Sequence, residues 1–165
     1  MQGSAMSFAL PPPDPVPIIG RASVIDGDTI EIHGKRIRLW GVDAPESRQT
    51  CTRARETYRC GQVSALHLAE LIGEQPVTCT PEGRPDRYRR IVARCSVTAL
   101  CEDSDCTDPT FRRELGGWMV ASGWAVDYPQ YSDGEHSEQQ FDAQEARKGM
   151  WAGEFQMPWE WRATK

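Results

Sequence analysis

The sequence predicts an α+β fold that is rich in β-strands, and three observations predict it. Apolar and polar residues alternate from 29 to 39 on both sides of a glycine-containing turn, which is typical of a β-hairpin. Segments 61–71 and 108–122 carry the apolar spacing or the end signals of helices. The chain has 165 residues, which is enough for one domain with a single hydrophobic core.

The N-terminal part is expected to lead into the domain without forming part of it. Residues 1–6 have the composition of an expression scar. Residues 7–17, which contain the run PPPDPVP, are expected to be extended. We therefore expect one domain at 18–165, which begins with a strand at 18–25.

The expected hairpin follows directly. If Gly34 and Lys35 form a two-residue turn, Ile32 faces Ile37 and Ile30 faces Leu39. One face of the hairpin is then apolar, which makes this register self-consistent.

The remaining elements are predicted from local patterns. They are an arginine-rich loop at 47–60, a helix at 61–71 that ends at Gly73, strands at 76–80 and 90–97 joined by a long turn at 82–89, a helix at 108–122 that ends at Gly123, and a helix that follows a capping box at 132–135 and ends at 148. The tail after it carries three tryptophans, which could stack on bases. Packing inside the domain is the preferred interpretation, because tryptophans in domains of this size are mostly buried.

Charge is unevenly distributed along the chain. The net charge is −5, which argues against a general polyanion binder. Residues 1–100, however, carry 13 basic and 11 acidic side chains, whereas residues 101–165 carry 6 and 13. The basic excess gathers at 35–59 and 84–94. Sixteen of the 19 basic residues are arginine, whose planar fork matches phosphate oxygens, although a solvated arginine-rich surface would have the same composition.

Six cysteines in a small domain indicate disulfides and an oxidising compartment. Cys79 can face Cys95 if the two strands that hold them pair, and near neighbours in sequence suggest Cys51–Cys60 and Cys101–Cys106 for the rest. Six cysteines allow 15 connectivities, so this pairing is a hypothesis, and free buried thiols are the alternative.

Zinc is not expected, because the cysteines and the three histidines lack the tight ligand pairs of zinc sites. The acidic residues between Cys101 and Cys106 favour a solvated turn over a second metal loop.

Two carboxylates separated by 15 residues are expected to meet at one end of the hairpin. The predicted register brings Asp28 beside residues 41–43, and therefore beside Asp43. Carboxylates this close repel unless a cation lies between them, and a hard cation such as Ca²⁺, or less readily Mg²⁺, takes oxygen ligands. Ordinary turn chemistry is the alternative for the Asp-Gly-Asp tripeptide at 26–28. An EF-hand is excluded because Ile30 stands at the third ligand position.

Three motifs together resemble the staphylococcal nuclease family: DGDT at 26–29, RLWGVDAPE at 38–46 and DRYRR at 86–90. The resemblance runs from about residue 18 to about residue 151, and the tail is similar to that of the secreted bacterial branch. It implies a five-stranded OB-type β-barrel with three α-helices, and a Ca²⁺-dependent phosphodiesterase that acts on DNA, RNA or both. We expect a monomer without membrane attachment, secreted or periplasmic, whose signal peptide is not part of this sequence.

The resemblance also assigns roles to individual residues. It implies that Asp28, Asp43 and the main-chain carbonyl of Ala44 hold Ca²⁺, that Arg38, Glu46 and Arg90 are catalytic, that Asp26 lies behind the metal ligands, and that Arg87, Tyr88 and Tyr131 contact the nucleotide. Glu46 would be the general base, and the two arginines would neutralise the phosphate. Ala44 replaces a family threonine, but a main-chain ligand is insensitive to that change. Arg89 replaces a family glycine, which predicts a strained loop if the position needs a positive φ.

Two other functions stay open. The first is a non-catalytic OB-type module that binds nucleic acid or protein. The presence of both aspartates, the glutamate and both arginines favours the enzyme over this module. The second is a disulfide-stapled secreted domain whose acidic face binds a basic partner.

Overall fold

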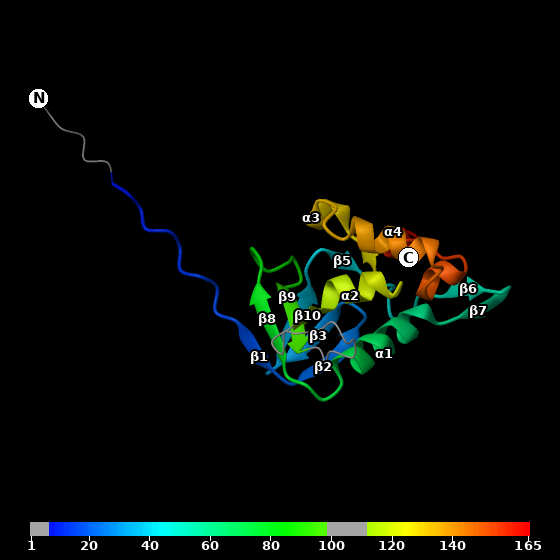
Figure 1. Cartoon of the computed structure of the whole chain (residues 1–165), viewed down its shortest axis with the longest axis horizontal. Coiled ribbons are helices and arrows are strands. Elements are labelled where there is room, and N and C mark those ends of the chain that lie inside the picture. The colour runs from blue at the N-terminus through cyan, green and yellow to red at the C-terminus, as the bar shows by residue number, and fades with distance from the viewer. Residues whose placement is uncertain (1–6, 99–111) are drawn as a thin grey trace, which may run out of the picture.

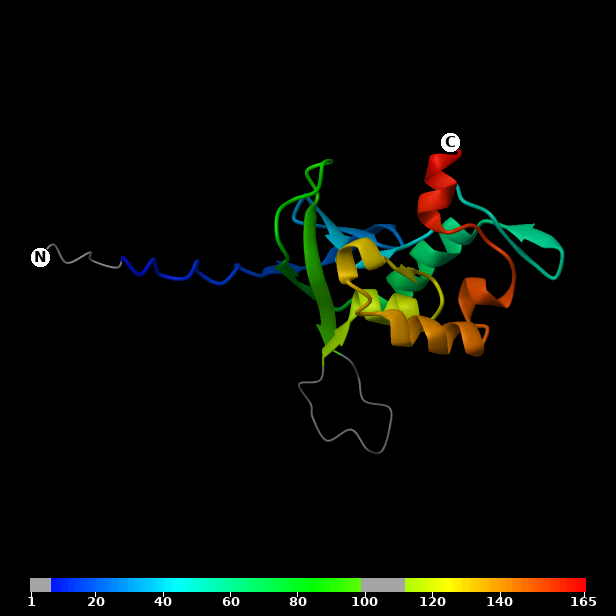
Figure 2. The ribbon, with the colours of Figure 1, turned by 90° about the horizontal axis from the view of Figure 1, so that it is seen from above.

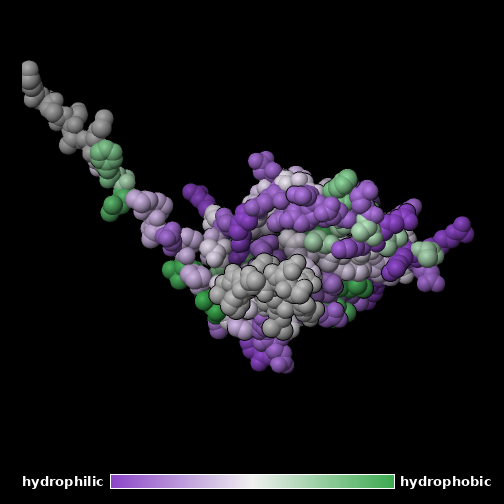
Figure 3. Space-filling model, in the orientation of Figure 1, coloured by the Kyte–Doolittle hydropathy of each residue, from purple (hydrophilic) through white to green (hydrophobic). Residues whose placement is uncertain are grey.

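The computed structural model describes residues 7–98 and 112–165. Its main sheet has seven strands. Their spatial order is β1 (Ile18–Gly20), β8 (Val77–Pro81), β9 (Ile91–Thr98), β4 (Lys35–Leu39), β3 (Thr29–Ile32) and β2 (Ala22–Asp26), and β10 (Arg112–Glu114) pairs with the end of β9. Residues 7–17 extend away from this body (Figures 1 and 3).

The sheet curls because its first and last strands are neighbours in the chain. The expected strand at 18–25 breaks at Arg21, and its two halves pair at opposite ends of the strand order, β1 with β8 and β2 with β3. The main sheet has seven strands where five were expected. One extra strand comes from the break at Arg21, and the other is the short strand β10. The result is the mixed α+β architecture with a curled sheet that an OB-type fold predicts.

The hairpin β3–β4 is present, but its register is shifted by two residues from the predicted one. Ile30 pairs with Ile37, and the turn is His33-Gly34 instead of Gly34-Lys35. Both turn residues have positive φ, 52° and 76°, as a type I′ turn requires. A shift of two keeps every side chain on its own face, so the four apolar side chains of the hairpin are still buried: Ile30, Ile32, Ile37 and Leu39.

The three expected helices are α1 (Cys60–Ile72), α2 (Leu115–Ala121) and α4 (Ser137–Glu145). The prediction for the second helix began too early, because residues 112–114 form β10, and Glu114 caps α2 by accepting the N–H of Gly117. The capping box expected at 132–135 is wrong: the Ser132 hydroxyl donates to Asp127, and α4 begins at Ser137. Shorter helices are α3 (Pro129–Ser132), η1 (Gly149–Ala152) and α5 (Pro158–Ala163).

The helices of the C-terminal part of the chain lie together on one side of the sheet (Figures 1 and 2). The short strand β5 (Val42–Asp43) pairs with β11 (Val126–Asp127), and the hairpin β6 (Cys51–Arg53) and β7 (Glu56–Tyr58) projects from the body. The predicted packing of the tail is confirmed for Trp151 and Trp159, which lie against a second apolar cluster around Met150. None of the helices in the described ranges is long and apolar enough to cross a membrane.

Two of the expected disulfides are present, Cys51–Cys60 and Cys79–Cys95. The second joins residues that face each other across β8 and β9, as the strand pairing predicted. The pair Cys101–Cys106 lies outside the described residues.

Candidate active site

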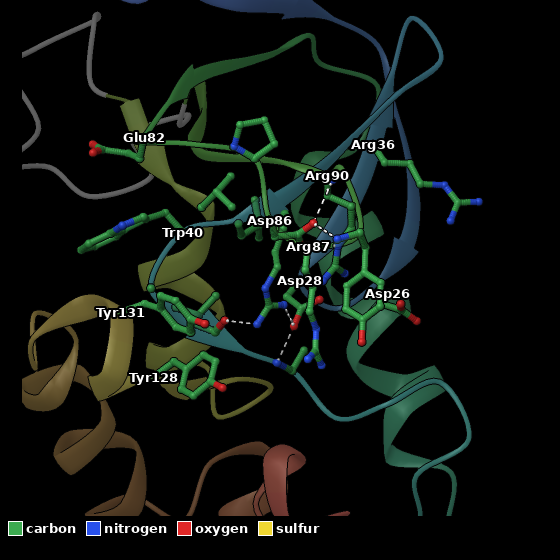
Figure 4. A pocket seen from close by; sticks show the side chains of 18 of the residues that line it. Asp26, Asp28, Arg36, Trp40, Glu82, Asp86, Arg87, Arg90, Tyr128 and Tyr131 are labelled. Atoms are coloured by element: carbon green, nitrogen blue, oxygen red, sulfur yellow. Dashed lines mark hydrogen bonds and ion pairs between the residues drawn. The ribbon is translucent and has the colours of Figure 1, made fainter. Parts of the chain in front are cut away.

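One cleft of about 940 Å³ is lined by most of the residues for which the sequence predicted a function (Figure 4). Its walls come from the end of β4 with the loop after it, from the segment 82–92, from residues 128–131, and from Arg162 of α5. The expected site residues in its lining are Asp26, Asp28, Arg38, Ala44, Glu46, Arg87, Tyr88, Arg90 and Tyr131. Asp43 is fully buried behind this wall.

Asp28 lies in the turn directly before β3, where three groups hold its carboxylate. Its Oδ2 accepts the Ala44 N–H at 2.9 Å and an Arg38 N–H at 3.0 Å, and its Oδ1 accepts the Thr29 hydroxyl at 2.9 Å. Burial opposes ionisation of Asp28, but the Arg38 charge and the Ala44 N–H together lower the pKa of this carboxyl. Asp28 is therefore held ionised in a position fixed by the segment that carries Asp43.

Arg38 joins the two aspartates. Its Nη1 donates to Asp28, and its Nη2 donates to Asp43 Oδ1 at 3.3 Å and to the Val42 carbonyl at 3.3 Å. Burial alone would lower the pKa of Arg38, but the two carboxylates raise it. The predicted meeting of Asp28 and Asp43 thus occurs around one shared cation, which in this structure is a guanidinium.

Asp43 belongs to β5 and pairs with Val126 of β11. Burial raises the pKa of its carboxyl, and Asp28 adds to that rise, while hydrogen bonds from Arg162 oppose it. The position of Asp43 therefore depends on a strand from the C-terminal half of the chain.

Arg90 is held by the turn at 86–90. The Asp86 carboxylate accepts the N–H groups of Tyr88 and Arg90, each at 2.9 Å, and the Arg90 Nε–H at 2.7 Å. Arg90 Nη1 also donates to the Thr29 hydroxyl at 3.4 Å, which brings this guanidinium next to Asp28. Arg89 has φ 64°, so the condition under which a strained loop was expected is met, and arginine occupies a backbone conformation that favours glycine.

Asp26 and Glu46 line the same cleft as Asp28. Burial raises the pKa of Asp26, and the negative charges of Asp28 and Glu46 raise it further. Glu46 receives a hydrogen bond from Arg162 at 2.7 Å. Three of the predicted carboxylates, Asp26, Asp28 and Glu46, therefore line one cleft together with several arginines.

Aromatic side chains lie at the rim. Tyr88 is 65% exposed, and the guanidinium groups of Arg87 and Arg90 lie over its ring at 4.9 and 5.4 Å. Tyr131 is 61% exposed and contacts Tyr128 edge to face. These exposed rings can stack on bases.

Sequence reasoning missed two residues of the cleft. Tyr128 lines it and stacks on Trp159 with ring centroids 5.4 Å apart. Arg162 binds both Asp43 and Glu46. Tyr128 lies three residues before Tyr131 and was a comparable candidate, whereas nothing in the local sequence around Arg162 signals its contact with residues more than 100 positions earlier.

The oxygen donors of the site fit a hard cation such as Ca²⁺. Asp28 and Asp43 already share one positive group, Arg38, and Ala44 follows Asp43 directly while its N–H binds Asp28. Among the residues described, no three His, Cys, Asp or Glu side chains form a metal-binding group. Water and a phosphate oxygen would therefore have to complete the six to eight ligands that Ca²⁺ takes.

A family model and several known proteins are similar to this chain. A family model described as "Staphylococcal nuclease homologue" matches residues 36–153. The chain is 41% identical to the succinoglycan biosynthesis protein ExoI of Rhizobium meliloti over 82% of this chain and 65% of that protein. It is 32% identical to a micrococcal nuclease of Shigella flexneri, over 84% and 76%, and 31% identical to an uncharacterized endonuclease of Escherichia coli, over 86% and 82%. The chain thus spans about two thirds to four fifths of the length of these relatives.

Proposed function

The chain belongs to the staphylococcal nuclease family, and from this premise we propose that it is a Ca²⁺-dependent nuclease that hydrolyses phosphodiester bonds of DNA, RNA or both. The observation that carries the proposal is the shared cleft. Asp28 and Asp43 meet around one positive charge, and Glu46 faces the same space. Arg90 donates to the hydroxyl of Thr29, which in turn donates to Asp28. Relatives named micrococcal nuclease and endonuclease support the class of reaction.

The residues that the sequence predicted for the site each have a part in the proposed reaction. Glu46 takes the proton from the attacking water. Arg38 and Arg90 neutralise the charge that builds on the phosphate and on the leaving oxygen. Asp28, Asp43 and the Ala44 carbonyl would hold Ca²⁺, which when bound supplies a positive charge against a phosphate oxygen. Asp26 orients water behind these ligands, and Arg87, Tyr88 and Tyr131 hold the nucleotide.

The test is hydrolysis of plasmid DNA, single-stranded DNA and RNA at alkaline pH, with millimolar Ca²⁺ or with EDTA. We expect cleavage with Ca²⁺ and none with EDTA. Glu46→Gln should lose about 10²-fold or more in turnover, which is the usual size of a general-base contribution, while it still binds a short oligonucleotide. Nucleic-acid binding by the parent without any metal-dependent cleavage would instead identify a binding module and would end the nuclease proposal.

We also propose a monomer of one domain at 18–165 that acts in an oxidising compartment, secreted or periplasmic. The two disulfides support this compartment, because such bonds persist where thiols are not kept reduced. Light scattering of the purified protein and fractionation of the source cells test the two parts separately.

A further inference from the structure

The tip of α5 reaches into the cleft and binds its carboxylates. Arg162 Nη2 donates to Asp43 Oδ2 at 2.7 Å, and Nη1 donates to Asp43 Oδ1 at 3.0 Å and to Glu46 Oε1 at 2.7 Å. A bidentate arginine–carboxylate pair is one of the stronger charged contacts in proteins. Arg162 is thus the residue that ties the C-terminal helix to the proposed metal ligand and to the proposed base.

These contacts occupy the oxygens that a metal ion would need. Asp43 is fully buried, and both of its carboxylate oxygens accept guanidinium protons, Oδ1 from both Arg38 and Arg162 and Oδ2 from Arg162. A divalent cation on Asp43 would stand within a few ångströms of the Arg162 charge, where like charges repel strongly in a partly buried site. Arg162 and a metal ion therefore compete for Asp43.

Arg162 can leave while the helix that carries it stays in place. Pro158 is buried, Trp159 stacks on Tyr128, and the Gln156 carbonyl accepts the Gln49 side-chain amide at 2.8 Å. These contacts anchor the helix at its first turn. The Arg162 side chain is 38% exposed and lies near the other end of the helix, so rotation about its own bonds is enough to free Asp43 Oδ2 and Glu46, while Asp43 Oδ1 keeps its hydrogen bond from Arg38.

We infer that Arg162 is a resident counter-cation of Asp43 and Glu46, which Ca²⁺ must displace, so that the C-terminal helix sets the metal affinity of the site. This inference rests on the proposed function, because it takes Asp43 as a metal ligand. In the absence of metal, Arg162 and Arg38 together compensate the buried charge of Asp43, and Arg162 also binds the carboxylate of Glu46, the proposed base. When Arg162 is displaced, Glu46 is released together with Asp43 Oδ2, so that metal binding also frees the base.

The first test measures Ca²⁺ affinity by calorimetry without nucleotide. Arg162→Ala should bind Ca²⁺ at least about tenfold more tightly than the parent, and Arg162→Lys should lie between them because it keeps the charge but loses the fork. Arg53→Ala is the matched control, since Arg53 is exposed and outside the cleft, and it should change affinity by less than about twofold. Equal or weaker Ca²⁺ binding by Arg162→Ala would overturn the inference.

The second test follows the guanidinium itself by NMR. The side-chain N–H signals of Arg162, assigned by their loss in Arg162→Lys, should be protected from exchange with water in EDTA and should lose that protection when Ca²⁺ is added. Ca²⁺ binding with unchanged Arg162 signals would overturn the inference alone. Failure of both the parent and Arg162→Ala to bind Ca²⁺ would overturn the proposed metal site as well, so the two failures are distinguishable.

Discussion

Repulsion between neighbouring carboxylates lowers the stability of the folded protein at Asp26. Burial, Asp28 and Glu46 raise its pKa in the folded protein, so the folded state binds the Asp26 proton more tightly than the unfolded chain does. The contribution of Asp26 therefore becomes unfavourable as pH rises from the ordinary carboxyl range through this raised pKa, and it stays unfavourable at neutral pH.

Asp26→Asn should accordingly stabilise the protein at pH 7. We expect a gain of about 0.2–1 kcal/mol, the usual range for partly exposed charges, and no gain below the ordinary aspartate pKa. Urea unfolding at pH 3.5 and pH 7 measures this difference. If Asp26 also orients water, the same variant should lose nuclease activity. A loss of stability at pH 7 would show that repulsion does not govern this residue.

Arg89 shows a strain that the neighbouring contacts offset. Its φ of 64° is costly for a residue with a side chain, but the Asp86 carboxylate holds the turn through the N–H groups on both sides of Arg89. Arg89→Gly removes the strain and increases the freedom of the unfolded chain, two effects of similar size. We expect stability to change by less than about 1 kcal/mol, and kcat/KM to stay equal or rise. A drop of tenfold or more would mean that the Arg89 side chain itself contacts substrate.

At the scale of elements, the two disulfides should contribute differently. Cys79–Cys95 joins β8 to β9 in the core and closes a sequence separation of 16 residues. Cys51–Cys60 closes a sequence separation of 9 residues, and Cys60 lies next to Gln49. The Gln49 side chain accepts the Glu46 N–H at 3.2 Å, and the Gln49 carbonyl accepts the Gly61 N–H. The first bond thus stabilises the sheet, and the second supports the loop that carries Glu46.

Replacing both members of Cys79–Cys95 by alanine should lower the free energy of unfolding by roughly 3 kcal/mol and leave kcat/KM at 20 °C within a few-fold. The same change at Cys51 and Cys60 should cost roughly 2–3 kcal/mol and should also reduce kcat. Denaturant titration and kinetics on the two variants give both quantities. Equal losses of kcat in the two would contradict this division.

Elements defined by local pattern were predictable from the sequence, and those defined by distant partners were not. Alternation identified the hairpin and its buried face, but the choice between two turns needed the positive φ of His33 and Gly34. Strand pairing identified Cys79–Cys95. Contacts between remote segments cause the break of the first strand at Arg21 and the ion pair between Arg162 and Asp43. The local sequence carries no signal for either.

At the scale of the whole molecule, local charge matters more than the net charge of −5. Three arginines of the 82–92 segment line the cleft: Arg84, Arg87 and Arg90. If each contacts one phosphate, the affinity of the Glu46→Gln variant for single-stranded DNA should fall with salt with a logarithmic slope of about −2. Fluorescence anisotropy from 50 to 300 mM salt measures this slope. Affinity that does not respond to salt would mean that stacking, and not phosphate contact, holds the strand.

The pairing of β5 with β11 has a consequence for how the protein is made. Asp43 pairs with Val126 of β11 and accepts hydrogen bonds from Arg162 as well as from Arg38, so these two distant contacts cannot form while the ribosome is still adding the second half of the chain. Contacts so distant in sequence form late and slowly. A nascent or prematurely ended chain therefore lacks β11 and Arg162, and the cleft is fully assembled only after synthesis is complete.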